Sequence, residues 1–255
     1  MTCSPESIRS IAALLKASRQ AIAFTGAGIS TPSGIPDFRD ADSGLWSHTN
    51  PLEVASIYGF RQNPSAFYNW VYPLAKLTFA AQPNPAHTAL AALEDRGLLK
   101  CVITQNIDML HTRAGSKVVY EIHGHLREAT CTKCFTVYPG EPILRQFLED
   151  HQVPHCPKCR GVIKPNVILF GEQLPYREIN AAQSAAQHTD LMLVIGSSLE
   201  VAPASDLPLL ALRSGAKLVI INLGSTDFDQ RAHQVLHADA AEVLPAILQC
   251  LEEIS

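Results

Sequence analysis

The stretch AIAFTGAGIS, residues 21–30, decides the fold of this chain. Its first half is a short apolar run typical of a buried strand, and the run stops at a Gly-Ala-Gly turn. Glycines at the exit of a strand let backbone amides approach a pyrophosphate, so a dinucleotide-binding turn is one interpretation. The sixth position of the usual glycine fingerprint is Thr31, however, so a tight turn without a ligand is equally compatible with this stretch alone.

Apolar runs and helical segments alternate along the rest of the chain. Residues 85–96 have helical periodicity and end at Gly97, and amphipathic helices are predicted over 4–15 and 240–254. Further short strands are predicted at 99–104, 118–122, 167–170, 191–195 and 217–221. Such strands separated by helices favour a mostly parallel sheet covered on both faces, the doubly wound α/β class, with ligands at the carboxyl ends of the strands.

Two stretches interrupt this alternation. Residues 36–82 are polar, aromatic and proline-containing, and residues 125–165 carry paired cysteines. We interpret them as a helical insertion and a second insertion that together build a small domain. The large α/β domain then consists of residues 1–35, 83–124 and 166–255.

The composition of the 255 residues is that of a globular protein, with 47% hydrophobic and 17% charged residues. The net charge is 20 − 24 = −4, so no overall positive field attracts nucleic acid or anionic lipid, and neither is an expected partner. No apolar stretch approaches the roughly 20 residues that span a bilayer. No basic segment leads into an apolar one at the N-terminus, so we expect a cytoplasmic protein.

Four of the seven cysteines form two C-x2-C pairs separated by 21 residues. Four thiolates at this spacing are typical of a closed, structural zinc site, whereas a redox pair is the main alternative for a single C-x2-C motif. The predicted zinc ligands are Cys131, Cys134, Cys156 and Cys159. The remaining cysteines, Cys3, Cys101 and Cys250, have no role that the sequence indicates, and His151 and His155 are interpreted as surface loop residues.

Polar residues follow several predicted strands where packing does not require them. Thr-Gln-Asn-Ile-Asp at 104–108 follows one strand, and His123-Gly124 follows another. Gly-Ser-Ser at 196–198 and Asn-Leu-Gly at 222–224 follow two more. Carboxyl ends of parallel strands meet at one edge of a sheet, so this pattern predicts a ligand site there.

The motifs taken in order resemble those of the sirtuins, which are NAD-dependent protein lysine deacylases. The resemblance covers residues 26–30 and 33–39, the strand ends above, both cysteine pairs, and Phe-Gly-Glu at 170–172. Ala-Gly-Ser-Lys at 114–117 and Lys-Pro-Asn at 164–166 are most similar to bacterial members. The resemblance implies a Rossmann-like large domain, a small zinc domain, and NAD and an acyl-lysine peptide meeting in the cleft between them.

The resemblance also implies roles for individual residues. His123 would be the general base, which takes a proton from a ribose hydroxyl after the acyl oxygen has displaced nicotinamide; a reference pKa of about 6.5 suits this role. His111 and His125 are interpreted as histidines without such a role. The implied NAD-binding residues are Ala27, Thr31, Phe38, Arg39, Gln105, Asn106, Ile107, Asp108, Ser197, Ser198, Asn222, Asp239 and Ala240.

The acyl-lysine peptide is expected to bind as an added strand, between residues 167–172 and 199–201. The implied contact residues are Ile168, Phe170, Gly171, Glu200 and Val201. Sirtuins that prefer acidic acyl chains carry Tyr-x-x-Arg in the helical insertion, whereas here Tyr68 is followed by Val71 at the Arg position. This favours acetyl and other neutral acyl groups. Mono-ADP-ribosyl transfer, a preference for longer apolar acyl chains, and an NAD-sensing or zinc-ribbon binding module without turnover are the alternatives.

Overall fold

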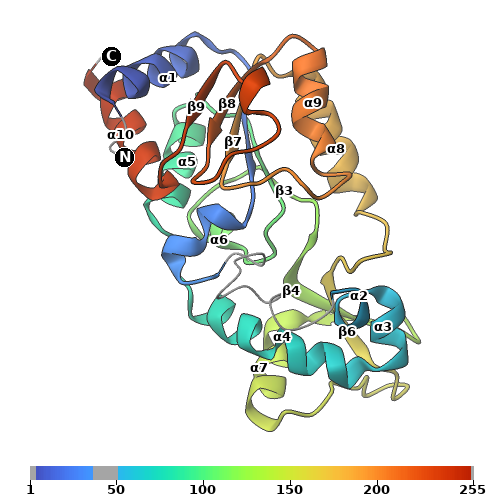
Figure 1. Cartoon of the computed structure of the whole chain (residues 1–255). Coiled ribbons are helices and arrows are strands. Elements are labelled where there is room, and N and C mark those ends of the chain that lie inside the picture. The colour runs from blue at the N-terminus through green and yellow to red at the C-terminus, as the bar shows by residue number, and fades with distance from the viewer. Residues whose placement is uncertain (1–3, 37–50, 254–255) are drawn as a thin grey trace.

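A computed structural model describes residues 4–36 and 51–253, and its larger sheet has six parallel strands (Figure 1). Their order is β3-β2-β1-β7-β8-β9. The strands are β1 (Ala21–Thr25), β2 (Val102–Thr104), β3 (Val119–Glu121), β7 (Leu191–Ile195), β8 (Lys217–Ile221) and β9 (Gln234–Leu236). The winding direction reverses between β1 and β7, which is the Rossmann arrangement and places the crevice for a ligand at the ends of these two strands.

Helices cover both faces of this sheet. On one face lie α1 (Pro5–Ala17), α5 (Pro85–Asp95) and α10 (Ala240–Glu253), and on the other lie α8 (Tyr176–His188) and α9 (Asp206–Arg213) (Figure 1). Side chains of β1 alternate between the two cores, so Ala23 packs with the first group and Phe24 with the second. The expected doubly wound α/β class is confirmed, and burial on both faces explains why the central strand β7 is apolar along its whole length.

A second, antiparallel sheet with the order β5-β4-β6 belongs to the small domain. Its strands are β4 (Gly124–Cys131), β5 (Val137–Pro139) and β6 (Ile163–Val167), and its helices are α2 (Pro51–Val54), α3 (Ile57–Gln62), α4 (Pro64–Ala80) and α7 (Gly140–Asp150). Phe67 and Tyr68 of α4 share one buried cluster with Leu126 of β4 and Phe147 of α7. Side chains of both insertions therefore share one buried cluster. The division of the chain into two domains stays a prediction.

The structure corrects several predicted strands. The run at 167–170 is not a strand of the large sheet, because the chain pairs with β4 over Ile163–Val167 instead. The strand was not predicted there because Pro165 is unusual inside a strand. Its residues alternate between buried and half-buried. The strands predicted at 99–104 and 118–122 are shorter than expected, with three residues each. The strand β9 was not predicted, because Gln234–Leu236 contains only two consecutive apolar residues.

The remaining short elements lie mostly at the carboxyl edge of the large sheet. They are the 3-10 helices η1 (Ala27–Ile29), η2 (Thr31–Ser33) and η3 (Asp229–Arg231), and the helix α6 (Leu110–Arg113). No helix in the described part of the chain combines the length and apolar character needed to cross a bilayer.

Candidate active site

The turns that follow β1 and β7 are in direct backbone contact. The Gly28 amide donates a hydrogen bond to the Gly196 carbonyl at 2.9 Å, and the Gly26 amide donates to Ile195 at 3.1 Å. A Cβ atom added to Gly28 would lie 2.8 Å from the Gly196 Cα atom, which real structures do not tolerate. Glycine is therefore required here so that the two turns can meet at the reversal point of the sheet.

A buried hydrogen-bond network joins the end of β2 to the turn after β1. Asn106 Nδ2 donates to the Gly26 carbonyl at 3.0 Å and to Ser30 Oγ at 3.1 Å. Ser30 Oγ donates to Asp108 Oδ2 at 2.7 Å, and the Leu110 amide donates to Asp108 Oδ1 at 2.9 Å. These bonds fix the orientation of both the carboxamide and the carboxylate.

Asp108 is a buried carboxyl group, only 4% exposed. Burial raises the pKa of Asp108, whereas the hydrogen bonds from the Leu110 amide and the Ser30 hydroxyl oppose this rise. The carboxylate can accept further hydrogen bonds beyond the two described. The site thus presents a buried carboxyl group whose orientation is fixed by hydrogen bonds.

Two histidines lie beneath this network, with ring centroids 4.8 Å apart. His87 Nδ1 accepts a hydrogen bond from the Asn84 amide, so its proton is on Nε2, 3.5 Å from Ser30 Oγ. Burial lowers the pKa of His87 to about 4. The sequence analysis did not assign His87 to the site, although its place three residues after the helix-capping Asn84 is a visible signal.

His111 is the second buried histidine and has a different set of partners. Thr25 Oγ1 donates to Thr104 Oγ1 at 2.8 Å and lies 2.9 Å from His111 Nε2, so this nitrogen carries the proton. Burial, and then the neighbouring His87, lower the pKa of His111 well below its usual range. Within residues 4–36 and 51–253, His111 Nδ1 is a buried acceptor without a partner. The interpretation of His111 as a core histidine agrees with this burial.

Gln105 connects three of the predicted strand ends. Its Nε2 donates to Ser197 Oγ, after β7, at 2.8 Å, and its backbone oxygen lies 3.2 Å from His123 Nδ1. A carbonyl only accepts, so Nδ1 of His123 carries the proton and Nε2 is left as the acceptor. Burial lowers the pKa of His123, and the hydrogen bond to Gln105 opposes this shift.

The other predicted NAD-binding residues are spread along the same edge. Ala27 and Thr31 lie in η1 and η2, and Ile107 is half-buried between Asn106 and Asp108. Asn222 follows β8, and its Nδ2 donates to the Gly224 carbonyl at 2.9 Å. Asp239 Oδ1 accepts from the Ala241 amide at 2.8 Å, where α10 begins at Ala240. Ser198 directly follows Ser197, whereas Phe38 and Arg39 lie outside the described residues.

The segment predicted to bind the peptide is held from two sides. The Ile168 amide donates to the His123 carbonyl at 2.8 Å, which joins the segment to the general base predicted above. Phe170 forms a parallel bridge with Ser56, because its amide donates to Ala55 and its carbonyl accepts from Ile57. Gly171 is exposed.

Of the residues predicted to face this segment, Glu200 is exposed and Val201 is half-buried. Tyr68 and Val71 are both buried in the core that the two insertions share, and the Tyr68 hydroxyl donates to the Ile163 carbonyl at 2.6 Å. An apolar side chain in this core supplies no partner for an acidic acyl chain.

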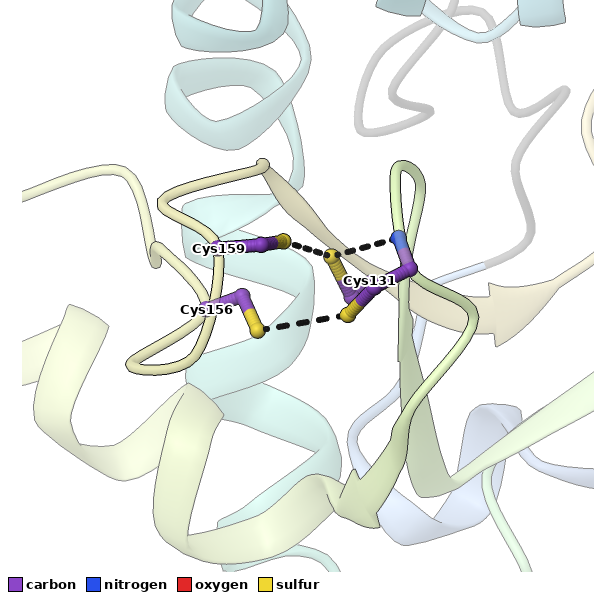
Figure 2. Close-up of side chains that lie close together, drawn as sticks. Cys131, Cys156 and Cys159 are labelled. Carbon is purple, nitrogen blue, oxygen red and sulfur yellow. Dashed lines mark hydrogen bonds between the residues drawn. The ribbon is translucent and has the colours of Figure 1, made fainter.

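The four paired cysteines converge in the small domain. Figure 2 shows the thiols of Cys131, Cys156 and Cys159 pointing toward one another from the two loops. All four sulfur atoms lie within 4.8 Å of one another, and the Cys131–Cys159 and Cys134–Cys156 pairs are 3.4 and 3.6 Å apart. Sulfurs bonded to one zinc at about 2.3 Å would be about 3.8 Å apart in a tetrahedron. The donor set and its spacing therefore fit a structural zinc ion.

The surroundings of the thiols support this fit. The hydroxyls of Tyr138 and Thr136 lie 3.0 Å from Cys156 Sγ and 3.3 Å from Cys134 Sγ, as expected for groups that stabilise thiolates. A Cβ atom on Gly161 would lie 2.9 Å from Cys131 Sγ, so a side chain here would press on the ligands. His151 and His155 are exposed and are not among the clustered ligand atoms.

Comparison with known proteins identifies the family of this chain. The model of the Sir2 family matches residues 26–203. The chain belongs to the Sir2 family. This assignment agrees with the resemblance carried by the sequence motifs.

Close relatives align over nearly the whole chain. An NAD-dependent protein deacetylase of Caldivirga maquilingensis is 48% identical over 94% of this chain and 92% of its own length. An NAD-dependent protein deacylase of Archaeoglobus fulgidus is 46% identical over 96% of both chains.

Solved Sir2 structures match the fold equally well. A structure described in terms of the mechanism and regulation of Sir2 enzymes has a TM-score of 0.92 and 43% identity, covering 99% of this chain and 100% of the other. A Sir2 complex with a deacetylated p53 peptide and 3'-O-acetyl ADP ribose has a TM-score of 0.90 and 42% identity, covering 95% and 98%.

Proposed function

We propose that this Sir2-family protein is an NAD-dependent protein lysine deacetylase, which transfers a neutral acyl group from lysine to ADP-ribose and releases nicotinamide. The observation that carries the proposal is the hydrogen bond between His123 Nδ1 and the Gln105 carbonyl. It leaves Nε2 of a neutral imidazole as the acceptor, beside the segment proposed for the peptide. A module that only binds NAD has no need of such a base.

His123 would take the proton of a ribose hydroxyl at Nε2. Its lowered pKa keeps the imidazole neutral, and therefore able to accept a proton, at neutral pH. When bound, NAD supplies a glycosidic bond whose cleavage releases nicotinamide and makes the ribose carbon available to the acyl oxygen. The protein's part is to orient the reactants and exclude water.

The carboxamide end of NAD would bind among Gln105, Asn106, Ile107 and Asp108. Asn106 and Asp108 are held rigid by hydrogen bonds to Gly26, Ser30 and Leu110, so they present fixed donors and acceptors. A fixed polar group loses little entropy on binding and can hold the glycosidic bond in a reactive conformation.

The phosphates and the adenosine half would extend along the edge of the sheet. Gly26 and Gly28 let the β1 and β7 turns approach each other closely, and the pyrophosphate would bind beside this contact. The remaining residues proposed for this half are Ala27, Thr31, Phe38, Arg39, Ser197, Ser198, Asn222, Asp239 and Ala240.

The acyl-lysine peptide would add a strand beside residues 168–172. Both backbone groups of Phe170 already pair with residues 55 and 57, so the peptide would use the opposite edge at Gly171, facing Glu200 and Val201. Ile168 and Phe170 would line the channel for the acyl-lysine side chain. Backbone pairing of this kind favours protein substrates with varied sequences.

Zinc bound to the four cysteines would be structural, because four protein ligands leave no open position for a substrate. We also propose the cytoplasm as the compartment, since an odd number of cysteines and a thiolate zinc site suit a reducing environment. Neither nucleic acid nor a membrane is part of the proposal, in line with the net charge of −4.

The test is to incubate the protein with an acetyl-lysine peptide, with and without NAD, and to weigh both products. Loss of the acetyl mass only in the presence of NAD, with formation of O-acetyl-ADP-ribose, is the expected result. A mass increase of an acceptor protein instead would indicate mono-ADP-ribosyl transfer. A parallel panel of propionyl, longer apolar and succinyl peptides would define the acyl preference, and efficient desuccinylation would contradict the interpretation of Val71.

A further inference from the structure

The base proposed above lies where the chain passes from one sheet to the other. Glu121 is the last residue of β3 in the six-stranded sheet, and Gly124 is the first residue of β4 in the three-stranded sheet (Figure 1). Ile122 and His123 form the crossing between the two strands. The position of the imidazole therefore depends on how the two sheets are joined at this crossing.

An ion pair spans the crossing. Arg127 of β4 reaches back to Glu121, with Nη1 donating to Oε1 at 2.6 Å and Nη2 donating to Oε2. One guanidinium thus binds both oxygens of the carboxylate, an arrangement that fixes direction as well as distance. We call this ion pair the crossing clamp, because His123 lies between its two members along the chain.

The shape of β4 allows the clamp to form. On the β6 side, Gly124 pairs with Val167, and Ala129 pairs with Pro165. Five steps along β4 therefore correspond to two steps along β6, and the additional residues, which include Arg127, form a bulge. Bulges bend a strand and redirect its side chains, and they are frequent next to active sites. Here the redirected side chain is that of Arg127.

Backbone hydrogen bonds hold the crossing at both of its residues. The Ile122 amide donates to the Thr104 carbonyl of β2 at 3.0 Å, and the His123 carbonyl accepts from the Ile168 amide at 2.8 Å. The first bond attaches the crossing to the large sheet, and the second attaches it to the segment that follows β6. The crossing clamp adds a direct link from β3 to β4 and so closes the span on both sides of His123.

The two members of the clamp differ in burial. The Glu121 side chain is 6% exposed, whereas the Arg127 side chain is 43% exposed. A buried carboxylate that loses its cation is strongly destabilised, so without the guanidinium this group would move toward water. β3 is the edge strand of its sheet and is held by β2 on one side only. The end of β3, two residues before His123, would therefore move with the carboxylate.

We propose that Arg127 is a positioning residue for His123. Through Glu121 it fixes the crossing between the two sheets, and with it the direction in which the imidazole presents Nε2. The inference rests on the proposed deacetylase function, in which His123 is the base. Arg127 acts through Glu121 and has no part of its own in the proton transfer.

The first test measures turnover of an acetyl-lysine peptide with NAD. Arg127→Ala should lower kcat about tenfold and change both KM values less than about twofold, because a misplaced base slows the reaction more than it weakens binding. Arg127→Lys should have an intermediate kcat, since an ammonium group does not reproduce the two-point contact with Glu121. Arg96→Ala, which breaks an exposed ion pair with Glu252, is the control and should keep the wild-type kcat.

A double-mutant cycle tests whether the two residues act as one unit. Glu121→Gln should lower kcat to a similar extent as Arg127→Ala. The variant with both substitutions should then be no slower than the slower single variant, because the same contact is lost in all three proteins.

Chemical rescue separates the clamp from a general loss of stability. Arg127 and Glu121 both line a cavity of about 580 Å³, so a small cation can reach the carboxylate once the arginine side chain is removed. Guanidinium chloride, at a concentration that does not unfold the protein, should raise the kcat of Arg127→Ala about threefold. Urea, which has a similar shape but no charge, should not, and wild-type kcat should respond to neither.

A further readout follows the His123 ring and does not require turnover. Nitrogen-15 NMR of the imidazole, assigned by comparison with His123→Gln, reports which ring nitrogen carries the proton. The wild-type protein should contain the form protonated at Nδ1, as the Gln105 carbonyl requires. Arg127→Ala should contain both forms, and thermal unfolding shows whether each variant is folded. If Arg127→Ala does not fold, Arg127→Lys and Glu121→Gln provide the same comparison.

These measurements separate the two proposals. In an active protein, a kcat of Arg127→Ala within about twofold of wild type overturns the clamp, as does a loss that guanidinium does not reverse or that Glu121→Gln increases by its full factor. If the wild-type protein shows no NAD-dependent deacetylation, the proposed function fails and the ring of His123 decides. An unchanged form of the ring in Arg127→Ala then overturns the clamp, and a mixture of the two forms supports it.

Discussion

The Nδ1 atom of His123 lies 3.2 Å from the backbone oxygen of Gln105. This hydrogen bond settles which ring nitrogen is protonated, because a carbonyl oxygen cannot donate. The side chain of Gln105 also binds Ser197. Gln105 therefore links the loops that follow β2, β3 and β7 at the edge of the sheet. The proposed base is thus oriented by a main-chain oxygen. A substitution of the Gln105 side chain would leave this hydrogen bond in place.

His123→Ala should reduce NAD-dependent deacetylation by about 10²- to 10⁴-fold, the usual contribution of a general base. Steady-state kcat/KM with an acetyl-lysine peptide measures this loss. The exposed His188, at the end of α8, is the matched control, and His188→Ala should retain full activity. Unchanged turnover in the His123 variant would falsify the role of this residue.

The pH dependence of the reaction should reflect the lowered pKa of His123. Burial disfavours the imidazolium, so the neutral base persists below the ordinary value of 6.5. The acid limb of the kcat/KM profile is therefore expected at a pH below 6.5. A limb with its midpoint above that value would mean that another group controls the rate or that His123 is not desolvated.

Much of the architecture could be predicted from the sequence, because buried parallel strands are continuous apolar runs. The run at 191–195 became β7, and the polar residues after it lie at the edge of the sheet as expected. The strand at Ile163–Val167 was predicted too far along the chain, at 167–170. Pro165 is unusual inside a strand, and the apolar run at 167–170 was the stronger signal. The position of β6 is set by its pairing with β4, which the local sequence does not reveal.

The candidate site was predicted only in part. Residues such as Gln105 and His123 follow strands, and the position of a strand end can be read from periodicity. The pair His87 and His111 lies on α5 and α6, which the strand β2 separates along the chain, so only the fold brings their rings together. Likewise, the bridge between Ser56 and Phe170 depends on how the helical insertion packs beside the peptide segment.

The buried pair His87 and His111 should make stability depend on pH. Both have pKa values lowered by burial, to about 4 for His87, whereas an unfolded chain binds protons at about 6.5. The unfolded state therefore gains protons first, and stability falls as the pH decreases from about 6.5 toward 4, by up to about 1.4 kcal/mol per pH unit for each histidine.

Urea unfolding at pH 7.5, 6.0 and 5.0 measures this dependence. His87→Gln should have a shallower slope over the same range, because one buried titrating group is removed. The exposed His155 provides the comparison, since His155→Gln should keep the wild-type slope. A slope that is identical in all three proteins would contradict this account.

Zinc should be required for the fold of the small domain. Cys156→Ser removes one of four ligands, so bound zinc, measured by elemental analysis, should fall from about one per chain to well below one. The variant should also lose a cooperative unfolding transition, because binding a structural metal is coupled to folding. Cys250→Ala, in α10, changes a thiol outside the cluster and should keep the metal. A soluble, fully active Cys156→Ser protein would exclude the assignment.

Lys164 should hold the peptide segment through Glu172. Lys164 Nζ lies 3.0 Å from Glu172 Oε2, the same oxygen that accepts from the Leu169 amide at 2.8 Å. Lys164→Met leaves this largely buried carboxylate without a cation, which should cost about 2 kcal/mol of stability and raise the peptide KM several-fold while kcat changes less. Arg145→Met breaks an exposed pair on α7 and should cost under about 0.5 kcal/mol. Equal effects of the two substitutions on the peptide KM would show that the Lys164 pair does not position the segment.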